Sequence, residues 1–221
     1  MTQRQIGSGL TEDHDVVVGY AGDRVAQPWI SVGSDARLRS GTVLYAGTSI
    51  GDRLQTGHHV IVREECVIGD DVAIWSNTVV DYGCRIGDRV KIHCNCYVAQ
   101  FTEIHDDAFL APGVTVANDL YPGQVESGQA MSGPWIGPGA QIGVNVTLLP
   151  YVRIGAGCLV GAGSVVTRDL PAGTVAYGNP AVVRGNVADL RDITTRVQQT
   201  DSASRFRVAG TSQLTQDAGR P

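Results

Sequence analysis

The sequence predicts an all-β protein folded as a parallel β-helix, a coil of short strands stacked in one direction. An aliphatic residue returns at every sixth position from Val32 to Val116 and again from Ile136 to Val166, with Thr56 as the exception. A period of six fits neither the 3.6 residues of a helical turn nor the alternation of an isolated strand. Three hexads to a turn stack residues that are eighteen apart, so we expect about seven coils.

Two further positions of the hexad support this geometry. The fifth position holds small or apolar side chains such as Val60, Cys66 and Val72, which we expect inside the coil. The second position is often glycine, as at Gly51 and Gly69, where a residue without Cβ can form a tight corner. The pattern therefore predicts a triangular prism with an apolar interior.

The continuity of the repeat favours one domain in a chain of 221 residues. We assign residues 1–31 to a cap over the N-terminal end of the solenoid and residues 32–175 to the β-helix, with a long loop at 120–135. Residues 176–197 are expected to form a C-terminal cap with a short helix. Residues 198–221 are polar and lack an apolar period, which predicts a disordered tail.

The loop at 120–135 is the main irregularity of the repeat. The hexad frame shifts by two residues between Val116 and Ile136, and the intervening segment is rich in glycine and proline. Long loops on a rigid scaffold are usually functional. A tolerated insertion is the alternative interpretation.

Composition argues against some classes of binding partner and favours one cellular compartment. The net charge is −5 and no basic cluster stands out, so we expect neither nucleic acid nor a membrane as a partner. No stretch approaches the ~18 apolar residues of a spanning helix, and the first residues lack a signal-peptide core, which favours the cytoplasm. Four of the five cysteines occupy the fifth position as small core residues. Cys94 and Cys96 are not spaced as a metal-binding pair, and we expect no metal site.

Stacking by eighteen gathers polar side chains that are distant in the sequence. His58, His59 and Asn77 should lie on the same side of successive coils as His93 and Asn95. Such a ladder is either a solvated face or a strip along which a substrate lies. We favour the second interpretation, because several imidazole and amide groups converge.

These motifs resemble the hexapeptide-repeat acyltransferase family, whose members form left-handed parallel β-helices and trimers. Residues 57–100 and the NDLYP segment at 118–122 resemble the branch that N-acetylates amino sugars attached to nucleotides. In that branch a KIxxN segment, here at residues 91–95, places an Asn beside the acceptor amine. Relatives often carry Gln where this chain has His93. The resemblance implies a catalytic role for Asn95 and substrate-binding roles for Asn118, Asp119 and Tyr121 of the NDLYP segment. The stacking adds His93 and His59 as candidate catalytic bases and His58 and Asn77 as candidate substrate-binding residues.

The C-terminal half resembles the coenzyme A region of the same family. The matching segments are GAGSVVTRDLPAG at 161–173 and GNPA at 178–181. A thin pantetheine arm can lie along small residues, and a guanidinium suits the phosphates at the nucleotide end. Some of these glycines could equally be corners alone. The implied acetyl-CoA-binding residues are Gly143, Gly161, Ala162, Thr167, Arg168 and Arg184.

The resemblance thus implies an acetyl-CoA-dependent N-acetyltransferase that acts on a nucleotide-linked amino sugar, with a site closed between subunits of a homotrimer. An O-acetyltransferase acting on a sugar or antibiotic hydroxyl is the main alternative. A metal-dependent carbonic anhydrase on the same prism would need three histidines at a spacing that this chain does not present. A non-catalytic solenoid scaffold is the remaining alternative.

Overall fold

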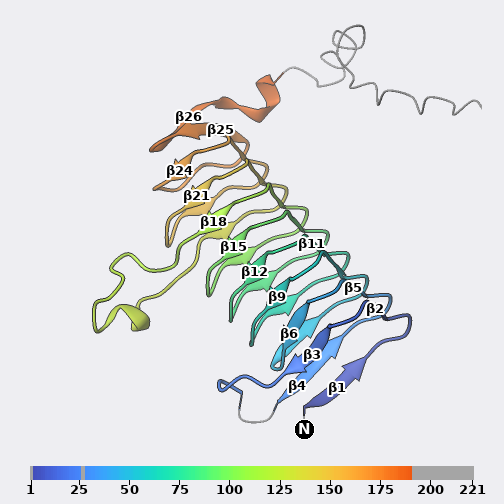
Figure 1. Cartoon of the computed structure of the whole chain (residues 1–221). Helices are drawn as coiled ribbons and strands as arrows, with labels where there is room; N and C mark the ends of the chain where they lie inside the picture. The colour runs from blue at the N-terminus through green and yellow to red at the C-terminus, as the bar shows by residue number, and fades with distance from the viewer. Residues whose placement is uncertain (1, 26–27, 191–221) are drawn as a thin grey trace, which may run out of the picture. The chain divides into compact units, whose positions relative to one another are not determined.

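The computed structural model describes residues 2–25 and 28–190, of which all but the last two belong to one compact unit. This unit is a left-handed parallel β-helix with three stacked sheets, as predicted (Figure 1). Sheet A contains β1 (Gln3–Ile6), β4 (Trp29–Val32), β7 (Thr48–Ile50), β10 (Val67–Ile68), β13 (Arg85–Ile86), β16 (Glu103–Ile104), β19 (Trp135–Ile136) and β22 (Arg153–Ile154). Sheet B contains β2 (Thr11–Glu12), β5 (Arg37–Leu38), β8 (Gln55–Thr56), β11 (Ala73–Ile74), β14 (Lys91–Ile92), β17 (Phe109–Leu110), β20 (Gln141–Ile142), β23 (Leu159–Val160), β25 (Thr174–Gly178) and β26 (Ala181–Asn186). Sheet C contains β3 (Val17–Tyr20), β6 (Val43–Tyr45), β9 (Ile61–Val62), β12 (Val79–Val80), β15 (Tyr97–Val98), β18 (Thr115–Val116), β21 (Thr147–Leu148) and β24 (Val165–Val166).

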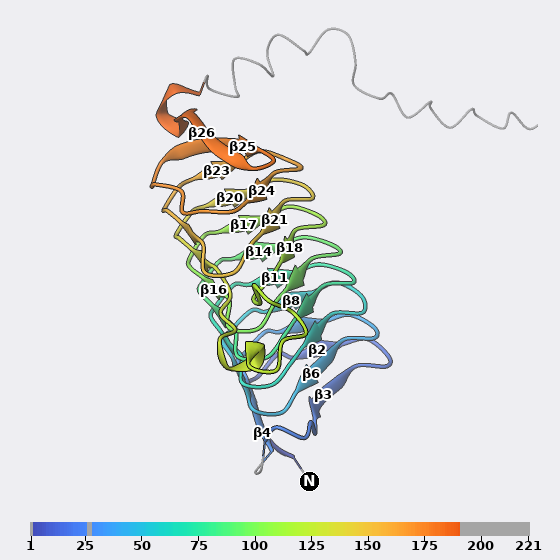
Figure 2. The ribbon, with the colours of Figure 1, turned by 90° about the vertical axis from the view of Figure 1, so that its left-hand side faces the viewer.

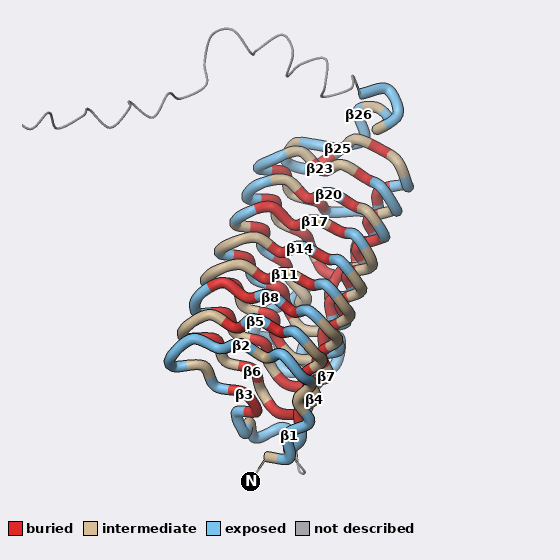
Figure 3. Tube along the Cα trace, turned by 90° about the vertical axis from the view of Figure 1, so that its right-hand side faces the viewer, coloured by how far each residue is buried: buried red, intermediate tan, exposed pale blue. Residues whose placement is uncertain are grey.

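The hexad ladder forms the core. Ile68 pairs with Ile86 and Ile74 with Ile92, so residues eighteen apart stack directly, and these side chains are buried. Buried segments recur in the successive strands of sheet B from β5 to β25 (Figure 3). Thr56, the one polar residue in the ladder, is also buried, because its hydroxyl lies 3.0 Å from the Thr42 hydroxyl and accepts a hydrogen bond from the Arg39 amide.

The three corners of the prism differ in chemistry, and each is named by the sheets it joins. The AB corner comprises 51–54, 69–72, 87–90, 105–108, 137–140 and 155–158. The BC corner comprises 57–60, 75–78, 93–96, 111–114, 143–146 and 161–164. The CA corner comprises 63–66, 81–84, 99–102, 117–134, 149–152 and 167–170.

The N-terminal segment differs from the expected cap. Within residues 1–31, strands β1, β2 and β3 form a further coil, in which β1 pairs with β4 and β2 pairs with β5, both in parallel. The described residues therefore contain eight coils. The hexad pattern misses the first coil for two reasons. Glu12 occupies a position of the aliphatic ladder, and the offset between Ile6 and Val32 exceeds eighteen by eight residues.

Two insertions leave the same corner of the prism. The long loop connects β18 to β19 over residues 117–134, close to the expected 120–135, and contains the 3-10 helix η1 (Ser127–Gln129). A shorter segment, described for residues 21–25, follows β3 and precedes β4. Both protrude from the CA corner, as Figure 1 and the rotated view in Figure 2 show.

At the C-terminal end, sheet B is closed by a hairpin. Strand β25 pairs in parallel with β23, and β26 returns antiparallel to β25. The 3-10 helix η2 (Val187–Asp189) follows, where a short helix was expected. Residues 191–197 of the expected cap and the expected tail at 198–221 lie outside the described residues. No helix in the described part of the chain has the length and apolar character needed to cross a bilayer.

Candidate functional site

The BC corner holds the predicted acceptor-side residues. His58 and His59 lie on one coil, Asn77 on the next, and His93 and Asn95 on the coil after that. The backbone fixes their stacking, since the Asn77 amide donates to the His58 carbonyl at 2.9 Å. His58, His59, Asn77 and Asn95 are exposed and His93 is half-buried. The structure therefore presents these side chains as one strip over three coils.

The two best-ordered side chains of this strip are histidines. The Nδ1 atom of His58 lies 2.7 Å from the Ser40 hydroxyl, one coil below. The ring of His93 packs between Phe109, at 4.8 Å between centroids, and Trp75, at 6.3 Å. Packing between two aromatic rings restricts the rotation of the imidazole, so His93 is held in one orientation at the corner.

Asn95 has a conformational reason for its identity that the sequence did not reveal. It occupies the left-handed region with φ 60°, as do Asn77 at 60° and His59 at 55°. Asn is several-fold enriched in this region among non-glycine residues. Its side chain is exposed and makes no hydrogen bond to another described residue, so the amide is available to a ligand. Backbone preference and chemistry both favour Asn here, and only experiment separates them.

Three of the predicted donor-side residues lie on the upper coils of the same BC corner. Gly143 is tightly stacked, because a Cβ there would lie 2.7 Å from the Ala162 amide nitrogen. A Cβ on Gly161 would lie 2.8 Å from the Tyr177 Cβ. Close packing of successive coils thus explains these glycines, and their identity is no sign of coenzyme A. Ala162 is exposed beside them.

The remaining predicted residues lie elsewhere. Asn118, Asp119 and Tyr121 open the long loop at the CA corner, and the exposed Thr167 and Arg168 lie at the same corner near its C-terminal end. Arg184 lies on β26 with its guanidinium 5.5 Å from the Tyr177 ring centroid. One chain does not bring the loop next to the histidine strip, because a side of the prism of up to about 20 Å separates the two corners.

The CA corner contains a buried polar network that sequence reasoning missed. Asp81 is 6% exposed and accepts hydrogen bonds from the Tyr97 hydroxyl at 2.9 Å and the Gln100 amide at 2.5 Å. Arg63 reaches Asp81 at 3.4 Å and Glu64 at 3.0 Å, and Glu64 is 1% exposed. The eighteen-residue spacing of Arg63 and Asp81, which have opposite charges, was the signal that could have revealed it.

This network reaches the long loop. The Gln100 side-chain oxygen Oε1 accepts a hydrogen bond from the Asn118 side-chain amide at 2.6 Å. Asn118 was predicted to bind substrate, but its side-chain N–H donates to Gln100 of the scaffold. Burial, followed by the hydrogen bond to Asp81, raises the pKa of Tyr97 to about 12. The hydrogen bond with Glu64 raises the pKa of Arg63. Tyr97 and Arg63 therefore keep their protons at neutral pH.

The AB corner is a structural ladder of aspartates. Asp70 Oδ1 accepts from the Asp52 amide at 2.8 Å, and Asp88 Oδ1 accepts from the Asp70 amide at 2.9 Å. Arg53 pairs with Asp71 on the next coil, which lowers the pKa of the Asp71 carboxyl. These carboxylates are thus engaged by backbone amides and guanidinium groups. Within residues 2–25 and 28–190, no group of three or more His, Cys, Asp or Glu side chains is arranged to hold a metal ion.

Comparison with known proteins identifies the repeat. The model described as bacterial transferase hexapeptide (six repeats) matches residues 83–118 and 133–168, and the model described as hexapeptide repeat of succinyl-transferase matches residues 65–100. A 2,3,4,5-tetrahydropyridine-2,6-dicarboxylate N-acetyltransferase of Staphylococcus aureus is 47% identical over 51 residues. This match covers 23% of the chain, and the chain spans only about a fifth (21%) of that relative's length.

Two solved structures extend the comparison. A UDP-N-acetylglucosamine acyltransferase from Campylobacter jejuni aligns with a TM-score of 0.68 over 89% of this chain and 78% of its own, at 18% identity, which shows the shared fold. A mutant of perosamine N-acetyltransferase from Caulobacter crescentus, in complex with CoA and GDP-perosamine, is 29% identical with a TM-score of 0.50. That alignment covers 57% of this chain and 54% of the other.

Proposed function

We propose that this chain, whose repeat is the hexapeptide repeat of bacterial transferases, moves an acetyl group from acetyl-CoA to the amine of a nucleotide-linked amino sugar. The observation that carries the proposal is the strip of His and Asn side chains at the BC corner, where the Asn95 amide has no hydrogen-bond partner among the described residues. The likeness to a perosamine N-acetyltransferase with bound CoA and GDP-perosamine supports the substrate class.

In the proposed reaction, the neutral amine attacks the thioester carbonyl, the carbon–sulfur bond breaks, and the amine loses a proton. Asn95 orients the amine or stabilises the oxyanion that forms on the carbonyl. His93 accepts the proton, because a neutral imidazole has a nitrogen lone pair for it and this ring packs between Trp75 and Phe109. His59 is the second candidate base. If neither histidine serves, the departing thiolate takes the proton.

The donor is proposed to lie along the upper coils of the BC corner. The exposed Ala162 presents only a methyl group at this corner, so a pantetheine arm could lie beside the backbone there. Arg184, on the hairpin that closes sheet B, would meet the phosphates. Thr167 and Arg168 lie on the other corner, so their contact with the same donor molecule requires another chain. We place the reaction in the cytoplasm, since all five cysteines are free thiols.

We propose a homotrimer, as the resemblance to hexapeptide-repeat acyltransferases implies, and the position of the predicted residues supports contact between copies. The loop residues Asn118, Asp119 and Tyr121 and the histidine strip flank opposite edges of sheet C and cannot meet within one chain. A second copy can place its CA corner against the BC corner of the first. The complete site then lies between subunits.

The test is release of free thiol from acetyl-CoA in the presence of a panel of nucleotide-linked amino sugars. Matched sugars that carry a hydroxyl in place of the amine distinguish N-transfer from O-transfer. Turnover with an amino sugar but not with its hydroxyl analogue is the expected result. Turnover with the hydroxyl analogues alone would indicate O-acetyl transfer in place of the proposed N-acetyl transfer. If neither set of sugars causes release of free thiol, acyl transfer to sugars is contradicted.

A further inference from the structure

The proposed reaction does not involve a cleft that lies at the base of the long loop. It has a volume of about 270 Å³ and lies where sheet A meets the CA corner. It is lined by Phe101, Glu103, Ser132, Gly133, Pro134, Trp135, Tyr151 and Arg153. Three aromatic side chains and a guanidinium in so small a volume suit a flat ring.

Two of these aromatic residues are held in a conformation that their side chains disfavour. Phe101 has φ 63° and Tyr151 has φ 66°. Among the described residues, eleven other non-glycine residues have positive φ, and all eleven carry polar or charged side chains. A bulky residue in the left-handed region costs about 1–3 kcal/mol and persists where it serves a purpose. Both aromatic exceptions line this one cleft.

The register places the two aromatic residues two levels apart at one corner position. Glu103 pairs with Trp135 and Trp135 pairs with Arg153, so Phe101, Gly133 and Tyr151 occupy the same corner position on three successive coils. The Phe101 ring lies over Gly83 and edge-on to Tyr82, with 5.4 Å between centroids. Gly133 is buried, and a Cβ there would clash with the Thr102 hydroxyl oxygen. The cleft is therefore bordered by an aromatic residue at each outer level and by a position without a side chain between them.

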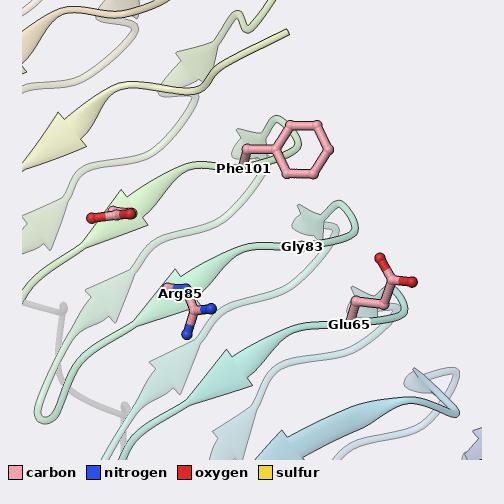
Figure 4. Close-up of a pocket in the computed structure, with 5 residues that line it drawn as sticks. Glu65, Gly83, Arg85 and Phe101 are labelled. Atoms are coloured by element: carbon pink, nitrogen blue, oxygen red, sulfur yellow. The ribbon is translucent and has the colours of Figure 1, made fainter. Parts of the chain in front are cut away.

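Charged side chains around the cleft suit a nucleotide. The guanidinium of Arg153 lies 4.4 Å from the Trp135 ring centroid and forms no ion pair with a described residue. Phe101 also borders a second groove, of about 350 Å³, which Glu65, Gly83, Arg85 and Glu103 complete. Figure 4 shows Phe101 projecting from the corner on the coil above Gly83, with Arg85 on the neighbouring strand. Arg85 is exposed and likewise has no carboxylate partner among the described residues.

We propose that the cleft between Phe101 and Tyr151 binds the nucleobase of a nucleotide, with the phosphates directed to Arg153 or Arg85. The inference rests on the proposed function, which supplies two sources of a base: the adenine of CoA and the base of the nucleotide-linked sugar. Stacking of a base on aromatic side chains provides affinity, and the Glu103 carboxylate can accept a hydrogen bond from an exocyclic amine.

The experiment measures dissociation constants by calorimetry for CoA, UDP, GDP and dTDP, with the full chain and the variants Phe101→Asn and Tyr151→Asn. Asn tolerates positive φ, so each substitution removes the ring and relieves the backbone strain. Tyr20→Ala is the matched control, because Tyr20 is an exposed aromatic near the first turn of the same corner. Each Asn variant should bind about ten-fold more weakly to one class of probe, since stacking on one ring is lost. Its Tm should be unchanged or higher.

The outcomes distinguish the two sources of the base, CoA and the nucleotide-linked sugar. They also distinguish failure of this inference from failure of the proposed function. Loss of affinity for CoA alone assigns the cleft to the donor, and loss for a nucleoside diphosphate alone assigns it to the acceptor. Unchanged dissociation constants, or a lower Tm with unchanged binding, would overturn the inference, and continued thiol release by these variants would leave the proposed function standing. A wild-type chain that binds none of the four probes would contradict both.

Discussion

The BC and CA corners flank the same sheet C and are built from the same hexads, yet they use polar residues in opposite ways. At the BC corner, His59, Asn77 and Asn95 point outward without hydrogen bonds to other described side chains. At the CA corner, Asp81 is nearly buried, accepts three hydrogen bonds and forms an ion pair with Arg63. Polar groups that the fold leaves unsatisfied are available to a ligand, whereas satisfied ones stabilise the scaffold.

The largest expected effect is on stability at the CA corner. Asp81→Ala removes the acceptor of Tyr97 and Gln100 and leaves Arg63 without one of its two carboxylates. Breaking a buried charged network costs on the order of 3 kcal/mol. The free energy of unfolding, measured by urea denaturation at fixed protein concentration, should fall by about that amount.

Asn77→Gly at the BC corner is the matched control for this comparison. Glycine accepts the positive φ of Asn77, and no hydrogen bond of a described partner is lost. The change in the free energy of unfolding should stay below about 0.5 kcal/mol. Equal urea midpoints for Asp81→Ala and Asn77→Gly would mean that the two corners do not differ in structural role.

The next effect concerns catalysis at the BC corner. Asn95→Gly keeps the left-handed backbone and removes only the amide group. If Asn95 acts on the amine or the oxyanion, kcat should fall by about 10²–10³-fold with little change in Tm. Asn95→Ala should lose the same activity and about 1 kcal/mol of stability besides, because alanine disfavours positive φ. Full activity of the glycine variant would reduce Asn95 to a backbone role.

His93 tests whether the strip supplies a base. His93→Gln retains a polar side chain between Trp75 and Phe109 but cannot accept the proton near neutral pH. We expect kcat to fall by about 10²-fold and the acidic limb of the pH–rate profile to disappear. The exposed His14→Ala serves as control. If His93→Gln retains nearly all of kcat while Asn95→Gly does not, the thiolate route is favoured.

The two corners also differ in how much of their structure can be predicted from the sequence. The ladder from Val32 to Val166 predicts the sheets, the register and the core, because each hexad repeats one packing requirement. The same eighteen-residue arithmetic places His58, His59, Asn77, His93 and Asn95 at one corner. These features depend only on spacing, and spacing is visible in a single sequence.

What the sequence did not reveal depends on local context. The first coil was hidden by Glu12 and by the insertion after β3. The positive φ at Asn95 shows that conformation contributes to a residue choice that was first interpreted as chemistry. The Asp81 network escaped because its members come from three levels of a corner whose side chains turn inward, and spacing alone does not give that direction.

A smaller effect links the network to the loop. Asn118→Ala removes the hydrogen bond to Gln100 and frees the first residues of the loop. We expect KM for the acceptor to rise about three- to ten-fold, the equivalent of one hydrogen bond of about 1 kcal/mol, with kcat less affected. Ser127→Ala is the comparison variant, because the exposed Ser127 hydroxyl donates to the Gln124 carbonyl within the loop. A fall in kcat with KM unchanged in Asn118→Ala would contradict a positioning role.

The smallest effect is a pH dependence confined to the CA corner. The pKa of Tyr97 is about 12, above the value near 10 of an unfolded tyrosine. Its contribution to stability is therefore complete below about pH 10 and is lost as the pH rises through 12. Because Tyr97 is 38% exposed, the loss should be about 1 kcal/mol. Guanidinium unfolding of the wild type and of Tyr97→Phe from pH 9 to pH 12 measures it, with the difference between the two curves shrinking towards high pH. Parallel curves would mean that Asp81 and the phenol are not coupled.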